Sequence, residues 1–321
     1  MLLSHLIVFF ILLLLALVYL RLAIHFGIVD KPNHRSSHTR ITVRGGGILF
    51  PFALIFWWFS HDFHHTWLIL GMLWISVISL LDDIYSLSRK LRFGIQFMAI
   101  SMAYYDLGVF GKLDWIALPI LYFISLGIIN AINFMDGING ITGLYGLVFF
   151  GTILAINKYM PIFEESMIYY IILAILVFLI FNFRKRALMF AGDIGSISLA
   201  FLMIYFLIEW YLASQTWTII LMLSVYGVDV CITMFERWRS GEKLSEPHRR
   251  HLYQMLANQG GIIHVGVAIS FAAFQAGINL YFFVIPQSLP SPLITSVALI
   301  LLGFLYVLIK HYFAKSLKPH F

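Results

Sequence analysis

Apolar stretches long enough to cross a lipid bilayer recur along the whole chain, and they constrain the fold more than any other feature. A helix of about 20 apolar residues spans the hydrocarbon core. Of the 321 residues, 61% are hydrophobic and 11% are charged, whereas roughly a quarter are charged in soluble domains. The sequence therefore predicts an all-α, polytopic membrane protein with a single domain, residues 1–321. We expect eleven transmembrane helices, at residues 3–24, 45–60, 66–81, 94–110, 116–132, 140–156, 167–183, 195–212, 216–234, 261–284 and 292–312.

Lysine and arginine are distributed very unevenly between the loops at alternate ends of these helices. One side carries 19 of them and the other side carries Lys112 and Lys158 only. Because cytoplasmic loops are enriched in positive charge, the rich side is predicted to be cytoplasmic, with the N-terminus outside and the C-terminus inside. The net charge of +6 then reflects topology and gives no evidence for nucleic-acid binding.

Nearly all the unusual polar residues fall in five segments on the predicted cytoplasmic side. The outer loops are short and carry few such residues. A site built from these segments would receive its substrate from the cytoplasm. The segments are residues 30–48, 81–93, 130–143, 182–196 and 236–254.

The segment NAINFMDGINGITG places polar side chains and glycines where two apolar stretches meet. Asn130, Asn133 and Asp136 recur every three residues, so they share one arc of a helix. Gly137, like the glycines that follow it, permits close backbone approach, and a helix start can accept an anion. The alternative is a glycine turn capped by Asn and Asp. Polar groups at a membrane edge are costly, so we favour a functional site.

Acidic residues mark two further segments. Asp82 and Asp83 end a predicted helix, and this pair taken alone favours a solvated helix end with nearby basic partners. If both carboxylates instead point into a low-dielectric site, they need a cation or a shared proton between them. Asp193 lies between glycines at the start of another helix. There it suits either a hard-cation ligand or a plain helix cap.

The last polar segment holds His248, Arg249, Arg250 and His251. Arginine presents a planar fork of donors to phosphate oxygens, so this cluster suits a diphosphate. The two histidines could bind a metal, but the carboxylates elsewhere favour Mg²⁺, with Mn²⁺ as the substitute.

Taken in order, these motifs resemble the polyprenyl-phosphate N-acetylhexosamine-1-phosphate transferases, glycosyltransferase family 4. The motifs are D-x-P-x-x-R-x-x-H before a glycine triplet, LDD, N-x-x-N-x-x-DG-x-x-G, GD-x-GS and a late His/Arg loop. The family includes the phospho-MurNAc-pentapeptide translocase and the enzymes that start O-antigen synthesis. The resemblance covers almost the whole chain.

The resemblance implies transfer of a sugar 1-phosphate from a UDP-N-acetylhexosamine to undecaprenyl phosphate, with release of UMP, in the bacterial cytoplasmic membrane; a homodimer is compatible with it. It also implies roles for residues. Asp82 and Asp83 resemble the catalytic acids that position the lipid phosphate. Asp193 and Asn133 resemble the metal site, and Asp136, Gly137 and Asn139 the nucleotide pocket. His248, Arg249, Arg250 and His251 resemble the diphosphate and sugar loop, while Arg35, His38, Arg44 and Asn130 are candidate phosphate contacts.

Two departures from the family pattern narrow this expectation. Asn139 stands where many bacterial members have a second Asp, so a charge at that position is not required. The late loop reads PHRRHLYQ, which resembles the O-antigen-initiating branch, whose sugars include GlcNAc, FucNAc and QuiNAc. Muramyl pentapeptide transfer is the alternative, and a membrane transporter or a scaffold is the alternative from another class.

Overall fold

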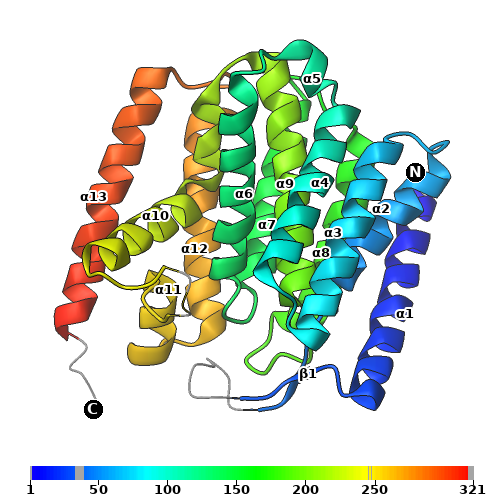
Figure 1. Ribbon diagram of the computed structural model, residues 1–321, viewed down its shortest axis with the longest axis horizontal. Coiled ribbons are helices and arrows are strands. Elements are labelled where there is room, and N and C mark those ends of the chain that lie inside the picture. Colours follow the sequence, from blue (N-terminus) through cyan, green and yellow to red (C-terminus); the bar gives the residue numbers. More distant parts are fainter. Residues whose placement is uncertain (1, 33–39, 245, 247, 317–321) are drawn as a thin grey trace.

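The computed structural model describes residues 2–32, 40–244, 246 and 248–316, and these are almost wholly helical. Long helices run side by side along most of the molecule (Figure 1). The strands among the described residues form one antiparallel pair, β1 (Val29–Asp30) with β2 (Thr42–Val43). The prediction of an all-α protein is confirmed.

The helical elements follow one another along the chain with short connections. Ser88 is the N-cap of the helix Arg89–Asp106, because its side chain accepts a hydrogen bond from the backbone N–H of Leu91. The elements are α1 (Leu2–Phe26), η1 (Gly46–Ile48), α2 (Leu49–Ser60), α3 (Thr66–Tyr85), α4 (Arg89–Asp106), α5 (Val109–Lys112), α6 (Ala117–Met135), α7 (Ile141–Asn157), α8 (Glu165–Asn182), α9 (Gly192–Ser214), η2 (Trp217–Leu223), α10 (Ser224–Arg239), α11 (Leu252–Gln254), η3 (Met255–Gln259), α12 (His264–Asn279), η4 (Leu280–Val284) and α13 (Pro292–Ser316).

Each of the eleven expected segments overlaps a helix, and four of them, 45–60, 94–110, 216–234 and 261–284, extend over two helical elements. Among the described residues, eight helices are long and apolar enough to cross a membrane, and Gly46–Ser60 and Ile141–Asn157 are shorter apolar helices. Helix α4 carries three basic residues in its first turn and is in neither group. The polytopic architecture is confirmed, while eleven crossings and their orientation stay predictions.

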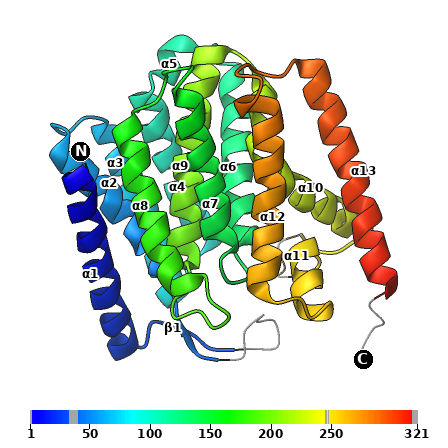
Figure 2. The ribbon, with the colours of Figure 1, turned by 180° about the vertical axis from the view of Figure 1, so that it is seen from behind.

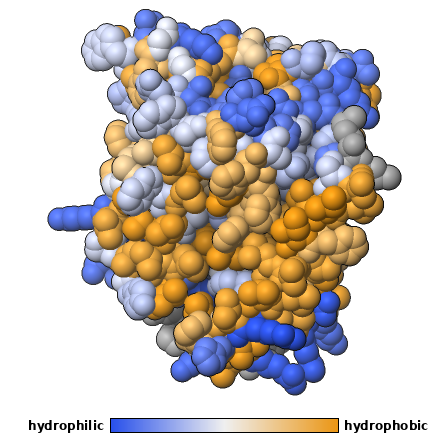
Figure 3. Space-filling model, turned by 90° about the vertical axis from the view of Figure 1, so that its right-hand side faces the viewer, coloured by the Kyte–Doolittle hydropathy of each residue, from blue (hydrophilic) through white to orange (hydrophobic). Residues whose placement is uncertain are grey.

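A belt of hydrophobic side chains covers the middle of one side of the molecule. Figure 3 shows this belt on the side where α1 lies, with hydrophilic residues above and below it. Phe10 on α1 and Phe304 on α13 are among the large apolar side chains that point outward. Outward apolar side chains are stable against lipid but not against water, so the belt marks the part of the protein that lies in the bilayer.

Helix α9 lies at the centre of the bundle (Figures 1 and 2). Most of its side chains are buried, and it packs against α3 and α6. The start of α9 lies at the end of the bundle near β1 and α11, where the five polar segments also gather (Figure 1). The central helix therefore delivers Asp193 to the polar end.

One expected transmembrane segment is not a single straight helix. Residues 216–234 were expected to span as one element, and they fall within one candidate span, Trp217–Arg239, in which η2 ends at Leu223 and α10 begins at Ser224. After this break, α10 runs obliquely to its neighbours (Figure 1). The oblique path brings Asp229 of α10 to the polar end of the bundle, where it accepts a hydrogen bond from the backbone N–H of Leu252 at the start of α11.

Candidate active site

The glycine triplet Gly45–Gly47 packs directly on the start of α9. A Cβ atom on Gly47 would collide with the backbone of Gly195, so a larger residue would force one of the two segments to shift. Gly45 and Gly192 both adopt positive φ angles, 83° and 72°, which favour glycine. Two backbone hydrogen bonds, donated by Gly46 and Gly47, join the glycine triplet to the residues just before α9. The two glycine motifs therefore interlock and bring residue 44 to residue 193.

A cluster of five charged side chains forms where these segments meet. The Nε of Arg44 lies 2.7 Å from Asp83, and its Nη2 lies 3.2 Å from Asp193. Arg92 lies 2.7 Å from Asp82 and 3.6 Å from Asp193. Although burial opposes the charge of Arg44, the carboxylates of Asp83 and Asp193 raise its pKa. We call these five residues the charged cluster.

The two adjacent acids of α3 have different surroundings. The Asp83 side chain is fully buried and accepts hydrogen bonds from the backbone N–H groups of Asp193 (2.8 Å) and Ile194 (3.2 Å). A carboxylate is stabilised at a helix N-terminus, so Asp83 caps α9. The reading of Asp193 as a plain cap is therefore wrong, because Asp193 lies in the first turn of the helix and its cap comes from α3. Asp82 is the more accessible of the two acids.

Asn133 joins the charged cluster to α6. Its Oδ1 accepts a hydrogen bond of 2.9 Å from the hydroxyl of Ser196, which lies one helical turn beyond Asp193. Asn133 and Asp193 thus face the same end of the bundle from two packed helices. Ser196 is a site residue that the sequence interpretation did not single out, although it closes the GD-x-GS motif.

The oxygen ligands of the charged cluster and Asn133 suit a hard cation, with its remaining ligands supplied by a bound substrate. Three carboxylates and two guanidinium groups leave the charged cluster with one excess negative charge. Carboxylate and amide oxygens suit Mg²⁺. Within the described residues, no three His, Cys, Asp or Glu side chains are arranged as a metal site, and the expected pair, Asp193 with Asn133, is below that number.

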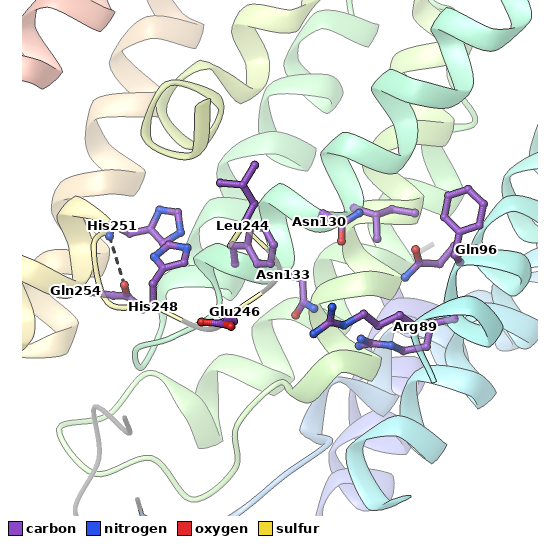
Figure 4. Close-up of a pocket in the computed structure, with 13 residues that line it drawn as sticks. Arg89, Gln96, Asn130, Asn133, Leu244, Glu246, His248, His251 and Gln254 are labelled. Carbon is purple, nitrogen blue, oxygen red and sulfur yellow. Dashed lines mark hydrogen bonds between the residues drawn. The ribbon is translucent and has the colours of Figure 1, made fainter. Parts of the chain in front are cut away.

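A cavity of about 490 Å³ opens beside the charged cluster. Figure 4 shows His248 and His251 on one side of it, Arg89 and Gln96 on the other, and Asn133 between them. Asn130 also lines the cavity, although its side-chain amide donates to the Leu126 carbonyl of its own helix. The lining residues are Arg89, Arg92, Phe93, Gln96, Ile129, Asn130, Asn133, Phe134, Leu244, Glu246, His248, His251 and Gln254.

The loop that carries the histidines is held by a buried arginine. The guanidinium of Arg237 on α10 is 2% exposed, and it donates to the carbonyls of Lys243 (2.7 Å), Leu244 (3.3 Å) and Glu246 (2.9 Å) and to the carboxylate of Glu242 (3.1 Å). A planar fork of donors can serve several acceptors at once. Arg237 therefore shapes the loop in front of the cavity, a role that topology alone did not indicate.

The four expected residues of this loop do not all face the cavity. His248 and His251 line it, whereas Arg249 and Arg250 are not among its described lining residues. Arg250 forms a 2.6 Å ion pair with Glu242. Burial, together with neighbouring positive groups such as Arg237, lowers the pKa of His248 to about 4, so His248 is neutral at pH 7.

The three residues expected at the nucleotide pocket lie in the turn between α6 and α7. Asp136 accepts a 2.6 Å hydrogen bond from Thr142, and burial raises its pKa to about 6. Asn139 donates to the carbonyl of Arg184 at 2.8 Å, so its amide supports the turn before α9. A Cβ atom on Gly137 would collide with the hydroxyl of Tyr253.

A second pocket, of about 880 Å³, lies beside this turn. Asn139 lines it together with the aromatic rings of Phe183 and Phe190. Four cationic side chains complete much of the wall: Arg40, Arg184, Lys185 and Arg186. Of the remaining expected phosphate contacts, Arg44 belongs to the charged cluster, and Arg35 and His38 lie outside the described residues.

The fold and the charged cluster define a helical membrane protein with a polar site at one end of its bundle. Residues 65–211 match the model of glycosyl transferase family 4. A probable undecaprenyl-phosphate N-acetylglucosaminyl 1-phosphate transferase of Bacillus subtilis (strain 168) is 28% identical over 258 residues, 74% of this chain and 71% of the relative. Undecaprenyl-phosphate alpha-N-acetylglucosaminyl 1-phosphate transferases of Salmonella typhi and Escherichia coli (strain K12) are also 28% identical, over 75% and 73% of this chain and 72% and 70% of their own. The match over residues 65–211 and these relatives support glycosyl transferase family 4 as the family that this chain resembles.

Proposed function

We propose that this protein transfers an N-acetylhexosamine 1-phosphate from a UDP-sugar to undecaprenyl phosphate and releases UMP. The observation that carries the proposal is the charged cluster beside a polar cavity at one end of a membrane bundle. The relatives are named for this type of transfer to undecaprenyl phosphate. Their names favour UDP-GlcNAc as the donor, ahead of UDP-FucNAc and UDP-QuiNAc.

The two substrates need a site that is polar at one end and apolar along its side. The cavity beside the charged cluster has arginine and amide groups for phosphate oxygens. An apolar groove of about 370 Å³, lined by α6, α9 and η2, offers a place for an isoprenoid chain. The second pocket offers aromatic faces for a base and cations for phosphates, which supports the nucleotide at Asn139.

The chemistry requires two anions to meet. The acceptor is a phosphate monoester with a second pKa of about 6, so it is already nucleophilic at neutral pH and does not require a strong base. The harder task is to neutralise charge and align the reacting atoms. The charged cluster has an excess negative charge by itself, so a diphosphate needs an added cation there. Asp193 and Asn133 would hold Mg²⁺, which supplies that positive charge when bound.

Within this scheme the two acids of α3 have separate tasks. Asp83 fixes the start of α9, and with it the position of Asp193. Asp82, paired with Arg92, orients the lipid phosphate for direct attack on the phosphorus next to the sugar. The competing route, through an aspartyl phosphate, would leave a phosphosugar on the protein when no lipid acceptor is present.

The site is proposed to face the cytoplasm of a bacterial inner membrane, because the loops on its side carry 19 of the 21 basic residues. There it would start lipid-linked O-antigen or another envelope polysaccharide.

The decisive assay measures UMP release by the purified chain with Mg²⁺ and undecaprenyl phosphate. The donors are UDP-GlcNAc, UDP-FucNAc, UDP-QuiNAc and UDP-MurNAc-pentapeptide. We expect release with UDP-GlcNAc, and near-complete loss of activity in Asp193→Asn. Release with only the muramyl donor would move the enzyme to peptidoglycan synthesis, and release with none would refute the proposed function.

A further inference from the structure

An acid inside an apolar helix lies behind the cavity. Asp229 on α10 is fully buried, and its Oδ1 lies 2.7 Å from the Nδ1 of His251. Its Oδ2 accepts the backbone N–H of Leu252 at 3.1 Å. A carboxylate can only accept, so Nδ1 of His251 carries the proton and Nε2 is the nitrogen left for another partner.

That second nitrogen has no partner among the described residues. His251 is 1% exposed, and its Nε2 atom is buried without a hydrogen bond. Because the ring nitrogens point in different directions and Nδ1 points to α10, Nε2 points away from α10. His251 lines the cavity, where Figure 4 shows its ring beside His248. A buried polar atom without a partner is unusual and marks a place for a ligand.

Further groups hold the carboxylate in place. Tyr306 of α13 donates to Asp229 at 3.1 Å, and Thr233 donates at 3.3 Å. Lys310 of α13 in turn donates to Thr233 at 2.9 Å and pairs with Glu236 at 2.6 Å. These contacts connect α13 to α10, while the contact with His251 is made by Asp229 alone.

The opposite wall of the cavity indicates what Nε2 contacts. Arg89 and Arg92 are cationic and Asn133 adds an amide, so the cavity suits an anion with several acceptor oxygens. A phosphate oxygen accepts hydrogen bonds, so Nε2 would bind it as an N–H donor. The contact of Asp229 with Nδ1 would hold the ring at the angle that this contact requires.

We propose that Asp229 is a positioning residue, which orients His251 so that Nε2 binds a phosphate oxygen of the substrate. This inference rests on the proposed function for the identity of the substrate. The phosphate belongs either to the donor diphosphate or to the lipid monoester, and the two KM values distinguish them. His251 makes and breaks no covalent bond.

Two substitutions of His251 separate the role of each nitrogen. His251→Asn places an amide near the Nδ1 position and keeps the contact with Asp229, whereas His251→Gln reaches toward the Nε2 position. We expect His251→Asn to fold normally and to raise KM for one substrate about 10- to 100-fold, as for loss of a charged hydrogen bond. His251→Gln should retain more affinity. Wild-type kinetics in His251→Asn would overturn the proposal.

Asp229→Asn tests the positioning role directly. It should lower kcat/KM about 10- to 100-fold, as loss of a carboxylate that orients a histidine does. Tyr306→Phe is the matched control, because it removes one donor to Asp229 and leaves the contact with His251, so it should stay within about threefold of wild type. Equal losses in Asp229→Asn and the control would overturn the assignment to Asp229.

A binding measurement keeps this test independent of turnover. In the wild-type chain labelled with ¹⁵N-histidine, inorganic diphosphate should shift the Nε2 resonance of His251, assigned by its absence in His251→Asn. If no UDP-sugar gives UMP release, the proposed function fails, and this resonance then decides the inference. A shift that is absent in Asp229→Asn supports it, and an unmoved resonance overturns it.

Discussion

Asp83→Asn tests whether the more buried acid of α3 is structural. The carboxylate of Asp83 accepts from Arg44 and from two backbone N–H groups of α9, whereas an asparagine has one acceptor oxygen and would point its amide at a donor. Removing one partner of a buried pair costs about 3–5 kcal/mol. At about 2 °C for each kcal/mol in a chain of this size, we expect the Tm to fall by about 6–10 °C.

The assay is thermal unfolding followed by tryptophan fluorescence in one detergent, with Asp82→Asn as the matched control. Asp82 pairs with Arg92, which is 29% exposed, and does not cap α9, so Asp82→Asn should lower the Tm by less than Asp83→Asn does. It should also slow transfer while the affinity for the UDP-sugar remains. An unchanged Tm in Asp83→Asn, together with abolished turnover, would place Asp83 on the substrate and refute the reasoning.

Three further predictions follow from other contacts. Gly47→Ala should destabilise the fold by about 1–3 kcal/mol and abolish turnover, because the added Cβ atom meets backbone there. Gly127→Ala is the control, since a Cβ atom at that position meets nothing within 4 Å. Equal Tm values for the two variants would contradict the close packing of Gly47 on Gly195. Arg237→Met removes the guanidinium that donates to the loop carbonyls of Lys243 and Glu246, so it should raise the KM for UDP-sugar at least about tenfold. Unaltered kinetics would leave Arg237 with a packing role only. The pKa of His248 is about 4, below its ordinary value of about 6.5, so the folded chain binds fewer protons than the unfolded chain between these values and stability should fall as the pH drops from 7 to 4. His248→Gln should reduce that dependence of the Tm on pH, and an unchanged dependence would assign it to other groups.

Several parts of the site could be predicted because each is a local pattern. The spacing of Asn130 and Asn133 placed them on one face of a helix, and both line the cavity. Asp82, Asp83 and Asp193 were expected at one end of the bundle, and they meet in the charged cluster. Helix periodicity and hydrophobic length fix such features over a few turns.

Other parts of the site could not be predicted, because they depend on contacts between distant segments. The sequence interpretation gave Asp82 and Asp83 one role, and only the packing of α3 on α9 shows that Asp83 caps that helix. Asp229 was overlooked in an apolar stretch, although an acid within a membrane segment is itself a signal of function. Its partner His251 lies 22 residues away, across the loop.

Hydropathy along the chain was enough to predict a polytopic helical membrane protein and the end of the bundle where the polar residues gather. Helices with long apolar runs are stable in lipid and not in water, and the polar residues between them are then confined to the ends of the helices. The tertiary structure alone decided which charges pair. The interlock of Gly47 with Gly195 brings Arg44 to Asp193, 149 residues further along the chain, and sequence spacing carries no information about such a contact.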